Sequence, residues 1–493
     1  MTGTWAIPPP DRAPVGSDLH LELDRPGGVR RSLTDSLREA VRGGRLAPGT
    51  RLPSSRSLAA DLGVARNTVA EAYADLVAEG WLVARQGSGT RVAERVAPAT
   101  GLRPVAAVRG GRPRRPVAPV HDLLSGRPDV SAFPRRAWLA STRRALATAP
   151  AAAFGLGDAL GRPELREALA GYLARARGVR AAPEQVVVCA GFGEVMDLLG
   201  RLLAGTGTLA VEGYGLWLHR DALGAAGCDV RPLTVDEGGA RVEELDGRED
   251  VGAVLLTPAH QYPLGVALRA DRRAAVLDWA RATGGLVLED DYDGEFRYDR
   301  QRVGSLQGLD PDRVVYLGTA SKSLAPGLRL AWMVVPERLV GAVRELRVIS
   351  RSSSLDQLVL ADFLDTGGYD RHVRAMRLRY RRRRDRLTAL LAEHAPHLEV
   401  RGINAGLHAV LALPAGTERA VLRAAARGGL ALEGLERFRY PGHPAGAGGA
   451  PADAVVVGYA APPDHGYAAA LAALLDVLPG PEEAEVTAWG RWR

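Results

Sequence analysis

The sequence contains almost no lysine. Of its 64 lysine and arginine side chains, 63 are arginine, and Lys322 is the single lysine in 493 residues. A guanidinium stays protonated at any workable pH, whereas a lysine ammonium can lose its proton and attack a carbonyl carbon. Lys322 is therefore a candidate nucleophile towards a carbonyl compound. The alternative is a surface lysine that has survived by chance.

Cysteine is nearly as rare, and long apolar runs are missing. Cys189 and Cys228 provide neither a disulfide framework nor a cluster of metal ligands, so we expect a reducing, cytoplasmic location and no metal site. No uninterrupted apolar run is long enough to cross a membrane, and residues 1–12 lack the basic-then-apolar order of a signal peptide. We therefore expect no membrane partner.

The net charge of +7 is unevenly distributed. Residues 1–120 hold 18 arginines against 11 acidic residues, whereas 46 basic and 46 acidic residues balance in the remaining 373. A basic segment joined to a neutral body indicates a polyanionic partner for the first part of the chain, or a solvated basic tail. The length predicts two or three domains.

The basic segment has a helical pattern that changes to short strands. Apolar periodicity from residue 30 predicts three helices that end at Gly43, Gly63 and Gly80, and Ser54 or Ser55 could cap the second. Short strands at 81–83 and 90–92 would enclose a glycine hairpin with a basic tip. This order is that of a winged helix-turn-helix, mainly α with a β-wing, whose third helix would enter the major groove of DNA.

The residue types on this unit suit a DNA duplex. Arg66, Asn67 and Thr68 open the third helix, where a guanidinium suits guanine and an amide suits adenine. The residues expected to contact the sugar-phosphate backbone of the DNA are Arg51, Ser54, Arg56, Arg85, Ser88, Gly89 and Arg91. The alternative is a helical protein-interaction module with an exposed arginine face.

A known family matches this pattern. The stretch GRLAPGTRLPSSRSLAADLGVARNTVAEAYADLVAEGWLVARQGSGTRVA resembles the GntR-type winged helix, which implies that residues 29–92 bind operator DNA. Residues 1–28, rich in proline and glycine, predict a flexible arm. Residues 93–120, rich in proline, glycine and arginine without periodicity, predict an extended linker. Two separately folded domains are expected.

From residue 121 strands alternate with helices, which predicts an α/β domain with a mostly parallel sheet covered on both faces. The apolar strand 186–189 runs into Gly191, Phe192 and Gly193, and a helix follows. Backbone amides at such a helix start could bind a phosphate. Further strands are predicted at 209–211, 254–256, 286–289, 314–317 and 332–335.

Acidic residues follow one of these strands. The run Glu289-Asp290-Asp291-Tyr292-Asp293 would lie at the carboxyl edge of the sheet, where open α/β sheets bind ligands. A carboxylate there could keep a pyridine nitrogen protonated. Metal binding, without an accompanying histidine cluster, and a solvated loop are the alternatives. The strand at 314–317 leads to hydroxyls, Lys322 and an arginine, which suit an aldehyde with a phosphate tail.

In this order along the chain, these features resemble a fold-type I pyridoxal-phosphate aminotransferase over residues 121–475. The resemblance implies one domain over 121–493 with a smaller C-terminal α+β subdomain, and pyridoxal 5′-phosphate (PLP) as cofactor. Lys322 would be the catalytic lysine that forms a Schiff base. Asp290, with Asp291 as the fallback, would pair with the pyridine nitrogen, and Tyr292 would bond the ring's phenolic oxygen. The phosphate would be held by Gly191, Phe192, Gly193, Thr319, Ser321 and Arg329.

A GntR winged helix fused to such a domain is the architecture of the MocR/GabR family of transcriptional regulators. The stretches TPAHQYPLG, EDDYDGEFRY, GTASKSLAPGLRLAWMV and GYDRHVRAMRLRYRRRRDRL resemble that family. It implies a head-to-tail homodimer on paired operator half-sites, with PLP or an amino compound as the signal. A working aminotransferase is the rival reading. A second domain that merely dimerises is a third.

The chain departs from the aminotransferase pattern beside the ring. Tyr262-Pro263-Leu264-Gly265 stands where Asn-Pro-x-Gly is usual, so Tyr262 joins the predicted cofactor contacts, and His260 or Gln261 could compensate for the missing amide. Leu216 stands where a stacking aromatic is common, with Tyr214 or Trp217 as substitutes.

A second departure concerns the substrate carboxylate. The late strand 455–461 carries no arginine to bind it, and Arg437 or Arg439 would be a distant substitute. Without that clamp, amino acids would bind loosely. The departure favours a sensor over an enzyme, and weakly favours PLP itself as the signal, with control of vitamin B6 synthesis. Arg381–Arg384 on a long helix would be a solvated face, or an interface or DNA contact.

Overall fold

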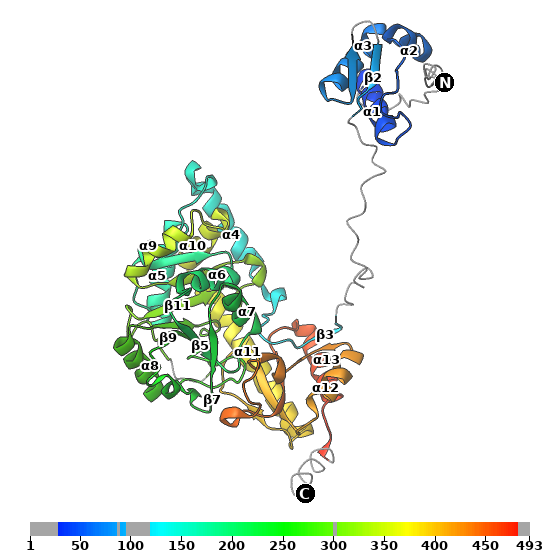
Figure 1. Ribbon diagram of the computed structural model, residues 1–493. Coiled ribbons are helices and arrows are strands. Elements are labelled where there is room, and N and C mark those ends of the chain that lie inside the picture. The colour runs from blue at the N-terminus through cyan, green and yellow to red at the C-terminus, as the bar shows by residue number, and fades with distance from the viewer. Residues whose placement is uncertain (1–27, 86–88, 95–118, 299–302, 482–493) are drawn as a thin grey trace, which may run out of the picture. The chain divides into compact units, whose positions relative to one another are not determined.

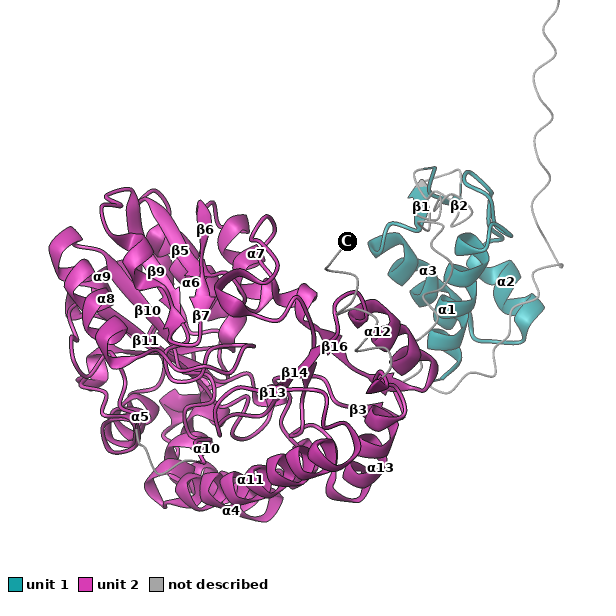
Figure 2. Cartoon of the chain, turned by 90° about the horizontal axis from the view of Figure 1, so that it is seen from below, with its two compact units in different colours: residues 1–117 teal, residues 118–493 magenta. Residues whose placement is uncertain are grey.

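The computed structural model describes residues 28–85, 89–94, 119–298 and 303–481. The chain divides into two compact units, residues 1–117 and 118–493 (Figure 2). The predicted arm and linker lie almost wholly outside the described residues. None of the helices in the described ranges combines the length and the apolarity that a bilayer crossing requires.

The first unit is the predicted winged helix-turn-helix (Figure 1). Helices α1 (Val29–Arg42), α2 (Ser55–Leu62) and α3 (Arg66–Ala78) precede the antiparallel hairpin β1 (Leu82–Arg85) and β2 (Gly89–Val92). Ser54 caps α2 by accepting the Ser57 N–H, and α2 ends at Gly63 with φ 67°, a conformation that glycine adopts without strain. Leu33 and Val69 are fully buried between the helices.

The second unit is built on a seven-stranded sheet, with strand order β4-β12-β11-β10-β9-β5-β6. The strands are β4 (Val186–Cys189), β5 (Thr208–Glu212), β6 (Val230–Leu233), β9 (Val251–Leu256), β10 (Leu286–Asp290), β11 (Val314–Thr319) and β12 (Ala331–Val334). Only β12 runs antiparallel to its neighbours in this sheet. The mostly parallel sheet expected from the sequence is confirmed.

Alternating apolar residues bury both faces of this sheet. Val187 and Leu288 belong to a core shared with α6 (Phe192–Leu203), α7 (Trp217–Ala225) and α9 (Glu337–Leu346). Val188 and Val287 point the other way. They belong to cores shared with α5 (Pro163–Arg177), α8 (Ala270–Thr283), α10 (Ser354–Asp365) and α11 (Gly368–His394), while α4 (Arg135–Thr148) packs on α10. A period of two predicts this division.

The C-terminal part is a smaller α+β subdomain. Its sheet has the order β13-β14-β17-β16 and is antiparallel throughout. The elements are β13 (Val400–Arg401), β14 (Ala409–Leu413), α12 (Glu418–Arg427), β15 (Leu430–Ala431), β16 (Glu433–Gly434), β17 (Asp453–Val457) and α13 (Asp464–Leu475). Strand β3 (His121–Asp122) pairs in parallel with β15, so the first strand of the second unit joins this subdomain. A small hairpin, β7 (Val235–Asp236) and β8 (Gly239–Ala240), completes the strands.

Candidate functional site

A cavity of about 210 Å³ lies at the carboxyl edge of the large sheet. Glu212, Asp290 and Thr319 are the last residues of β5, β10 and β11, and all three line it. The predicted cofactor residues on its wall are Phe192, Tyr262, Asp290, Tyr292, Thr319, Ser321 and Lys322. The position agrees with the general rule that open α/β sheets bind ligands beyond the carboxyl ends of their strands.

Lys322 stands in the turn after β11. Its Nζ donates a hydrogen bond to the Gly126 carbonyl oxygen at 2.6 Å. Burial lowers the pKa of its ammonium, while the negative charges of Asp290 and Asp293 oppose that shift. A lowered pKa raises the fraction of neutral amine, which is the form that attacks a carbonyl carbon.

Asp290 presents an unpartnered oxygen to the cavity. Its side chain is buried, and Oδ1 has no hydrogen-bond partner among the described residues. Burial raises the pKa of this carboxyl group well above its usual value. Oδ2 lies 3.9 Å from His219 Nδ1. A buried acceptor without a donor is rare, and a protonated pyridine nitrogen would supply the donor, so the site fits PLP.

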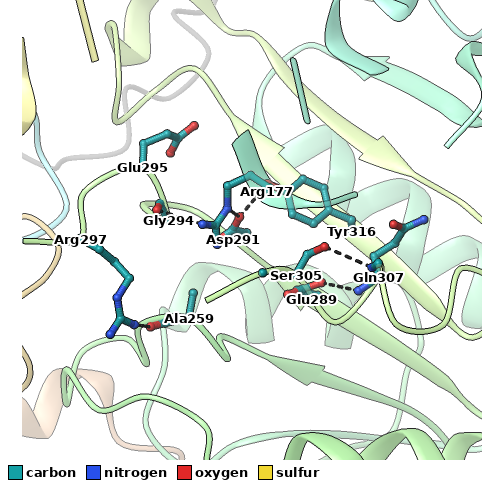
Figure 3. A network of polar contacts seen from close by, with 12 residues as sticks. Arg177, Ala259, Glu289, Asp291, Gly294, Glu295, Arg297, Ser305, Gln307 and Tyr316 are labelled. Carbon is teal, nitrogen blue, oxygen red and sulfur yellow. Dashed lines mark hydrogen bonds and ion pairs between the residues drawn. The ribbon is translucent and has the colours of Figure 1, made fainter. Parts of the chain in front are cut away.

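The neighbouring Asp291 is already committed elsewhere (Figure 3). Arg177 Nε and Nη2 donate to its two carboxylate oxygens at 2.6 and 2.9 Å, and the Tyr316 hydroxyl donates to Oδ2 at 2.7 Å. Glu289, which precedes Asp290 in the chain, accepts the backbone N–H groups of Leu306 and Gln307. The geometry therefore favours Asp290 over the fallback Asp291 for a ring nitrogen.

The glycine turn before α6 lies against Arg329. A Cβ on Gly191 would be 2.8 Å from the Arg329 Cζ and would displace the guanidinium, and the φ of 86° at this position favours glycine. Arg329 itself has φ 52°, which is uncommon for a non-glycine residue. Glu194 Oε2 accepts the Ala190 N–H at 2.6 Å and so fixes the turn. Gly193 lies in the first turn of α6.

The other predicted phosphate ligands are Thr319, the last residue of β11, and Ser321 in the turn that follows. The Thr319 hydroxyl donates to the Ser321 Oγ at 2.9 Å and accepts the Ser321 backbone N–H. Of the residues predicted to hold the phosphate, Phe192, Thr319 and Ser321 line the cavity. Gly191 and Arg329 contact each other but are not part of the cavity wall.

The two residues expected to replace the missing asparagine do not line the cavity. Gln261 Nε2 donates to the carbonyl oxygens of Tyr214 and Tyr262, so its side chain holds two backbone segments together. His260 Nδ1 lies 2.8 Å from Asp293 Oδ2 and 3.1 Å from the hydroxyl of Tyr292, which lines the cavity.

Tyr262 and the stacking substitutes have different surroundings. The Tyr262 hydroxyl lies 2.5 Å from the Ser125 Oγ. Leu216 and Trp217 line the cavity, whereas Tyr214 is buried in a separate core. Phe192 stacks on His219 with ring centroids 4.7 Å apart.

Sequence reasoning missed His219, Glu212, Ser125 and Gly126, which all line the cavity. Burial lowers the pKa of His219 to about 3 and raises that of Glu212 to about 7. The polar residue that ends β5, Glu212, was a usable signal because it occupies the same place as Asp290 on β10. Nothing in the sequence pattern indicated Ser125 and Gly126, which are almost 200 residues from Lys322.

The arginines offered as carboxylate clamps are engaged elsewhere. Arg437 lies over the Trp217 ring and pairs with Glu433 at 3.1 Å, and Arg439 pairs with Glu436 at 2.6 Å. Arg220 lines the cavity but lies over Tyr440 and pairs with Asp221. Directly after β17, a Cβ on Gly458 would lie 2.1 Å from the Leu124 carbonyl oxygen. No side chain fits at Gly458.

This close contact predicts a stability effect. We expect Gly458→Ala to lower the free energy of unfolding by about 1–3 kcal/mol, the usual cost of overpacking, because the methyl group would overlap Leu124. Gly341→Ala is the matched control, since its methyl group would meet nothing within 4 Å and α9 favours alanine. Urea unfolding measures both. An unchanged midpoint for Gly458→Ala would contradict the close approach.

The predicted DNA contacts lie on the surface of the first unit. Arg66 and Asn67 are exposed in the first turn of α3, and Thr68 is half-buried. Arg51, Arg56 and Arg91 are exposed as well, and Arg51 and Arg91 are bridge partners. A Cβ on Gly89 would lie 3.3 Å from Arg51 Nε, so the wing packs against the Arg51 side chain at this glycine. Arg85 belongs to β1, Ser54 caps α2, and Ser88 lies outside the described residues.

The fold and the site define a winged helix joined to an aminotransferase-type unit. Residues 30–92 match the family of bacterial regulatory proteins called gntR, and residues 119–441 match aminotransferase class I and II. Among solved structures, an archaeal alanine:glyoxylate aminotransferase is similar, with a TM-score of 0.64 and 24% identity. That similarity covers 73% of this chain and 90% of the other. It supports the fold.

Curated relatives have the same two parts. The chain is 36% identical to the uncharacterized HTH-type transcriptional regulator YhdI of Bacillus subtilis, over 84% of this chain and 88% of that one. It is 36% identical to the probable rhizopine catabolism regulatory protein MocR of Rhizobium meliloti, over 83% and 87%. It is 34% identical to the pyridoxine biosynthesis transcriptional regulator PdxR of Corynebacterium glutamicum, over 84% and 90%.

The chain therefore belongs to the MocR/GabR-type family of transcriptional regulators, in which a GntR winged helix precedes an aminotransferase-like domain. Its partner is DNA, and pyridoxal 5′-phosphate is its cofactor. These findings confirm the family, the cofactor and the regulatory role expected from the sequence.

Proposed function

We propose that this regulator senses PLP, or an amino compound that reacts with it, at Lys322, and that the bound state changes its affinity for operator DNA. One observation carries the proposal. A cavity brings the single lysine together with an unpartnered Asp290 carboxylate oxygen, in a chain whose first unit is a winged helix. The protein would act in the bacterial cytoplasm, where its DNA partner is.

Individual residues have defined tasks in this proposal. Bound PLP supplies an aldehyde carbon that amines attack and a ring that withdraws electrons from it. Lys322 provides the nucleophile, and Asp290 accepts a hydrogen bond from the ring nitrogen. Tyr292 donates to the phenolic oxygen beside Tyr262. Thr319, Ser321, Arg329 and the amides at the start of α6 (Gly191, Phe192, Gly193) hold the phosphate.

The missing carboxylate clamp bears on the signal. The late strand 455–461 carries no arginine, and Arg437 and Arg439 are paired with glutamates. α-Amino acids would lack the bidentate contact that orients them for turnover. We therefore favour PLP itself as the signal, and with it control of vitamin B6 synthesis, over transamination. Transfer of an amino group from a donor to a keto acid by the purified protein would support the enzyme reading instead.

We also propose a head-to-tail homodimer. Large apolar side chains are exposed on elements that pack together: α4 (Leu139, Leu146), the 151–156 segment (Phe154, Leu156) and the start of α10 (Leu355). Several neighbouring exposed apolar residues indicate a protein interface, and a second copy would suit paired operator half-sites. Sedimentation that gives the mass of one chain at micromolar concentration would exclude it.

Two substitutions in the first unit are expected to weaken DNA binding differently. Asn67→Ala should cost about 1–3 kcal/mol on the preferred operator and little on unrelated DNA, because an amide reads a base edge. Arg56→Ala should weaken binding to every sequence and reduce the slope of log affinity against log salt by about one. Fluorescence anisotropy over a range of salt concentrations measures both effects.

Arg31→Ala is the matched control for these two variants, since Arg31 is exposed on α1 outside the predicted contacts. It should leave the sequence preference unchanged. A salt dependence that is flat for the wild type would mean that the assigned phosphate contacts are wrong.

The proposed function is tested by an operator titration. DNA from the gene's own upstream region is titrated at fixed salt, with and without PLP. An affinity that changes with PLP supports PLP sensing. Tight binding that ignores PLP points to an amino compound as the signal. A failure to bind any upstream fragment more tightly than unrelated DNA would contradict the proposal.

A further inference from the structure

The chain that leaves the DNA-binding unit enters the second unit through residues 121–127, named here the anchor segment. The second unit begins at Ala118, three residues before β3. We propose that the Gly126 carbonyl oxygen and the cofactor compete for the Lys322 nitrogen, so that the anchor segment reports the state of Lys322. This competition presupposes the proposed function and names its route of regulation.

The outer part of the anchor segment is held by the C-terminal subdomain. The Leu123 side chain is fully buried in its core. The Leu123 N–H donates to the Ala431 carbonyl oxygen at 3.0 Å, and its own carbonyl oxygen accepts the Gly458 N–H at 2.8 Å. The His121 N–H donates to the Gly429 carbonyl oxygen at 3.1 Å. These bonds hold the start of the described part of the second unit against the C-terminal subdomain.

The inner part of the anchor segment forms a wall of the cavity. Ser125 and Gly126 line it, and the Ser125 Oγ lies 2.5 Å from the Tyr262 hydroxyl and donates to Glu433 Oε2 at 3.3 Å. The Gly126 carbonyl oxygen accepts the Lys322 N–H at 2.6 Å. Gly126 has φ 68°, and a Cβ there would lie 3.3 Å from Lys322 Nζ, so glycine permits the close approach. Gly126, which contacts the reactive lysine, is therefore only three residues along the chain from the buried Leu123.

The chemistry of the lysine makes the two partners compete. A lysine ammonium has three hydrogens to donate. When its amine condenses with an aldehyde, a C=N bond forms and the aldehyde oxygen leaves as water with two hydrogens from the nitrogen. At most one hydrogen then remains on the nitrogen, and the phenolic oxygen of the ring would compete with the Gly126 carbonyl oxygen for it. A primary amine that takes over the C=N bond passes its two hydrogens to Lys322, which can donate to Gly126 again.

Formation of the C=N bond at Lys322 thus weakens the contact that holds the anchor segment. An amine that takes over the C=N bond restores that contact. Both ligands act on one local equilibrium between an anchored and a released segment. A ligand shifts such an equilibrium by its differential interaction with the two states. The contact between Lys322 and Gly126 supplies that difference.

Amide hydrogen exchange of the full-length protein tests the proposal without any variant. On addition of PLP, we expect exchange of the His121, Leu123 and Leu124 amides to become about tenfold faster, as expected for a strong hydrogen bond lost from a local opening reaction. A ligand that only stabilised the fold would slow exchange everywhere. Amides of β14 should not become faster, and those at the start of α6 should become slower.

The outcomes are separable. Anchor-segment exchange that stays unchanged or slows, while the visible absorption of PLP shows that Lys322 is loaded, would overturn the competition alone. A protein whose absorption shows no uptake of PLP would overturn the proposed function as well. Addition of methylamine to the loaded protein should return the anchor-segment exchange to its slow value, and a failure to do so would also count against the competition.

Two variants sharpen the test. Lys322→Arg keeps a cationic donor but cannot form the C=N bond, so its anchor segment should exchange slowly with or without PLP. Ser125→Ala removes the other inner contacts and should give fast exchange without PLP. Ser131→Ala is its matched control, because the Ser131 hydroxyl binds Asp129 away from the cavity. Equal exchange in Ser125→Ala and Ser131→Ala would contradict the role of the inner wall.

Discussion

Alanine in place of Lys322 is expected to abolish the effect of PLP on operator binding. Couplings between sites typically change affinity by about 5–150-fold, and this factor should fall to one because no other lysine can condense with the aldehyde. The variant should therefore have a single operator affinity, the same with and without PLP. Anisotropy titrations of both proteins, with and without PLP, measure the factor.

The composition makes a clean control possible. Lys322 is the single lysine of the chain, so borohydride treatment of the protein with PLP should attach the cofactor to one lysine-containing peptide. Lys322→Arg should give no labelled internal peptide and no PLP response. A PLP response that survives in Lys322→Ala would contradict a covalent site at this residue.

Methionine in place of Arg177 is expected to lower the free energy of unfolding by about 3–5 kcal/mol, because it leaves the Asp291 carboxylate buried without its cation. Side-chain exposure is 7% for Arg177 and 1% for Asp291. Tyr316 alone would remain as a donor to that carboxylate (Figure 3). Thermal or urea unfolding measures the loss.

The control pair is Arg248 and Asp250, which is exposed to solvent and bound at 2.8 Å. Arg248→Met should leave the unfolding midpoint unchanged, because exposed pairs contribute little. Combining Arg177→Met with Asp291→Leu should restore part of the lost stability. A midpoint for Arg177→Met equal to that of Arg248→Met would mean that the buried pair does not contribute.

The order of elements could be predicted from the sequence because each has a local signal. Strands such as 186–189 and 314–317 are continuous apolar runs between turns, and α1 and α2 are capped by Gly43 and Gly63. The third predicted end, Gly80, lies one residue beyond Glu79, the C-cap of α3. The edge strand β6 was not predicted, since Val230–Leu233 is short and contains an arginine and a proline. Lys322 stood out by composition alone.

The choice between Asp290 and Asp291 could not be made from local pattern. It depends on Arg177, which is 114 residues earlier in the chain and takes both oxygens of Asp291. His260 or Gln261 was offered as a substitute for the missing amide, but their bonds to Asp293 and to backbone carbonyls keep both out of the cavity lining. These outcomes rest on side-chain contacts between distant elements, which periodicity does not record.

The same limit explains the missed wall of the cavity. Ser125 and Gly126 follow a two-residue strand whose partner, β15, is about 300 residues away. The close approach of the Leu124 carbonyl oxygen to Gly458, which leaves no space for a side chain there, was likewise not visible in the sequence.

The most direct test of PLP-linked DNA binding is the PLP affinity of the free protein and of the operator-bound protein, measured by absorption titration at one salt concentration. Linkage requires that operator changes the PLP affinity by the same factor as PLP changes the operator affinity. We predict two different PLP affinities whose ratio equals that factor. Equal PLP affinities for the free and the operator-bound protein would contradict a PLP-sensing regulator.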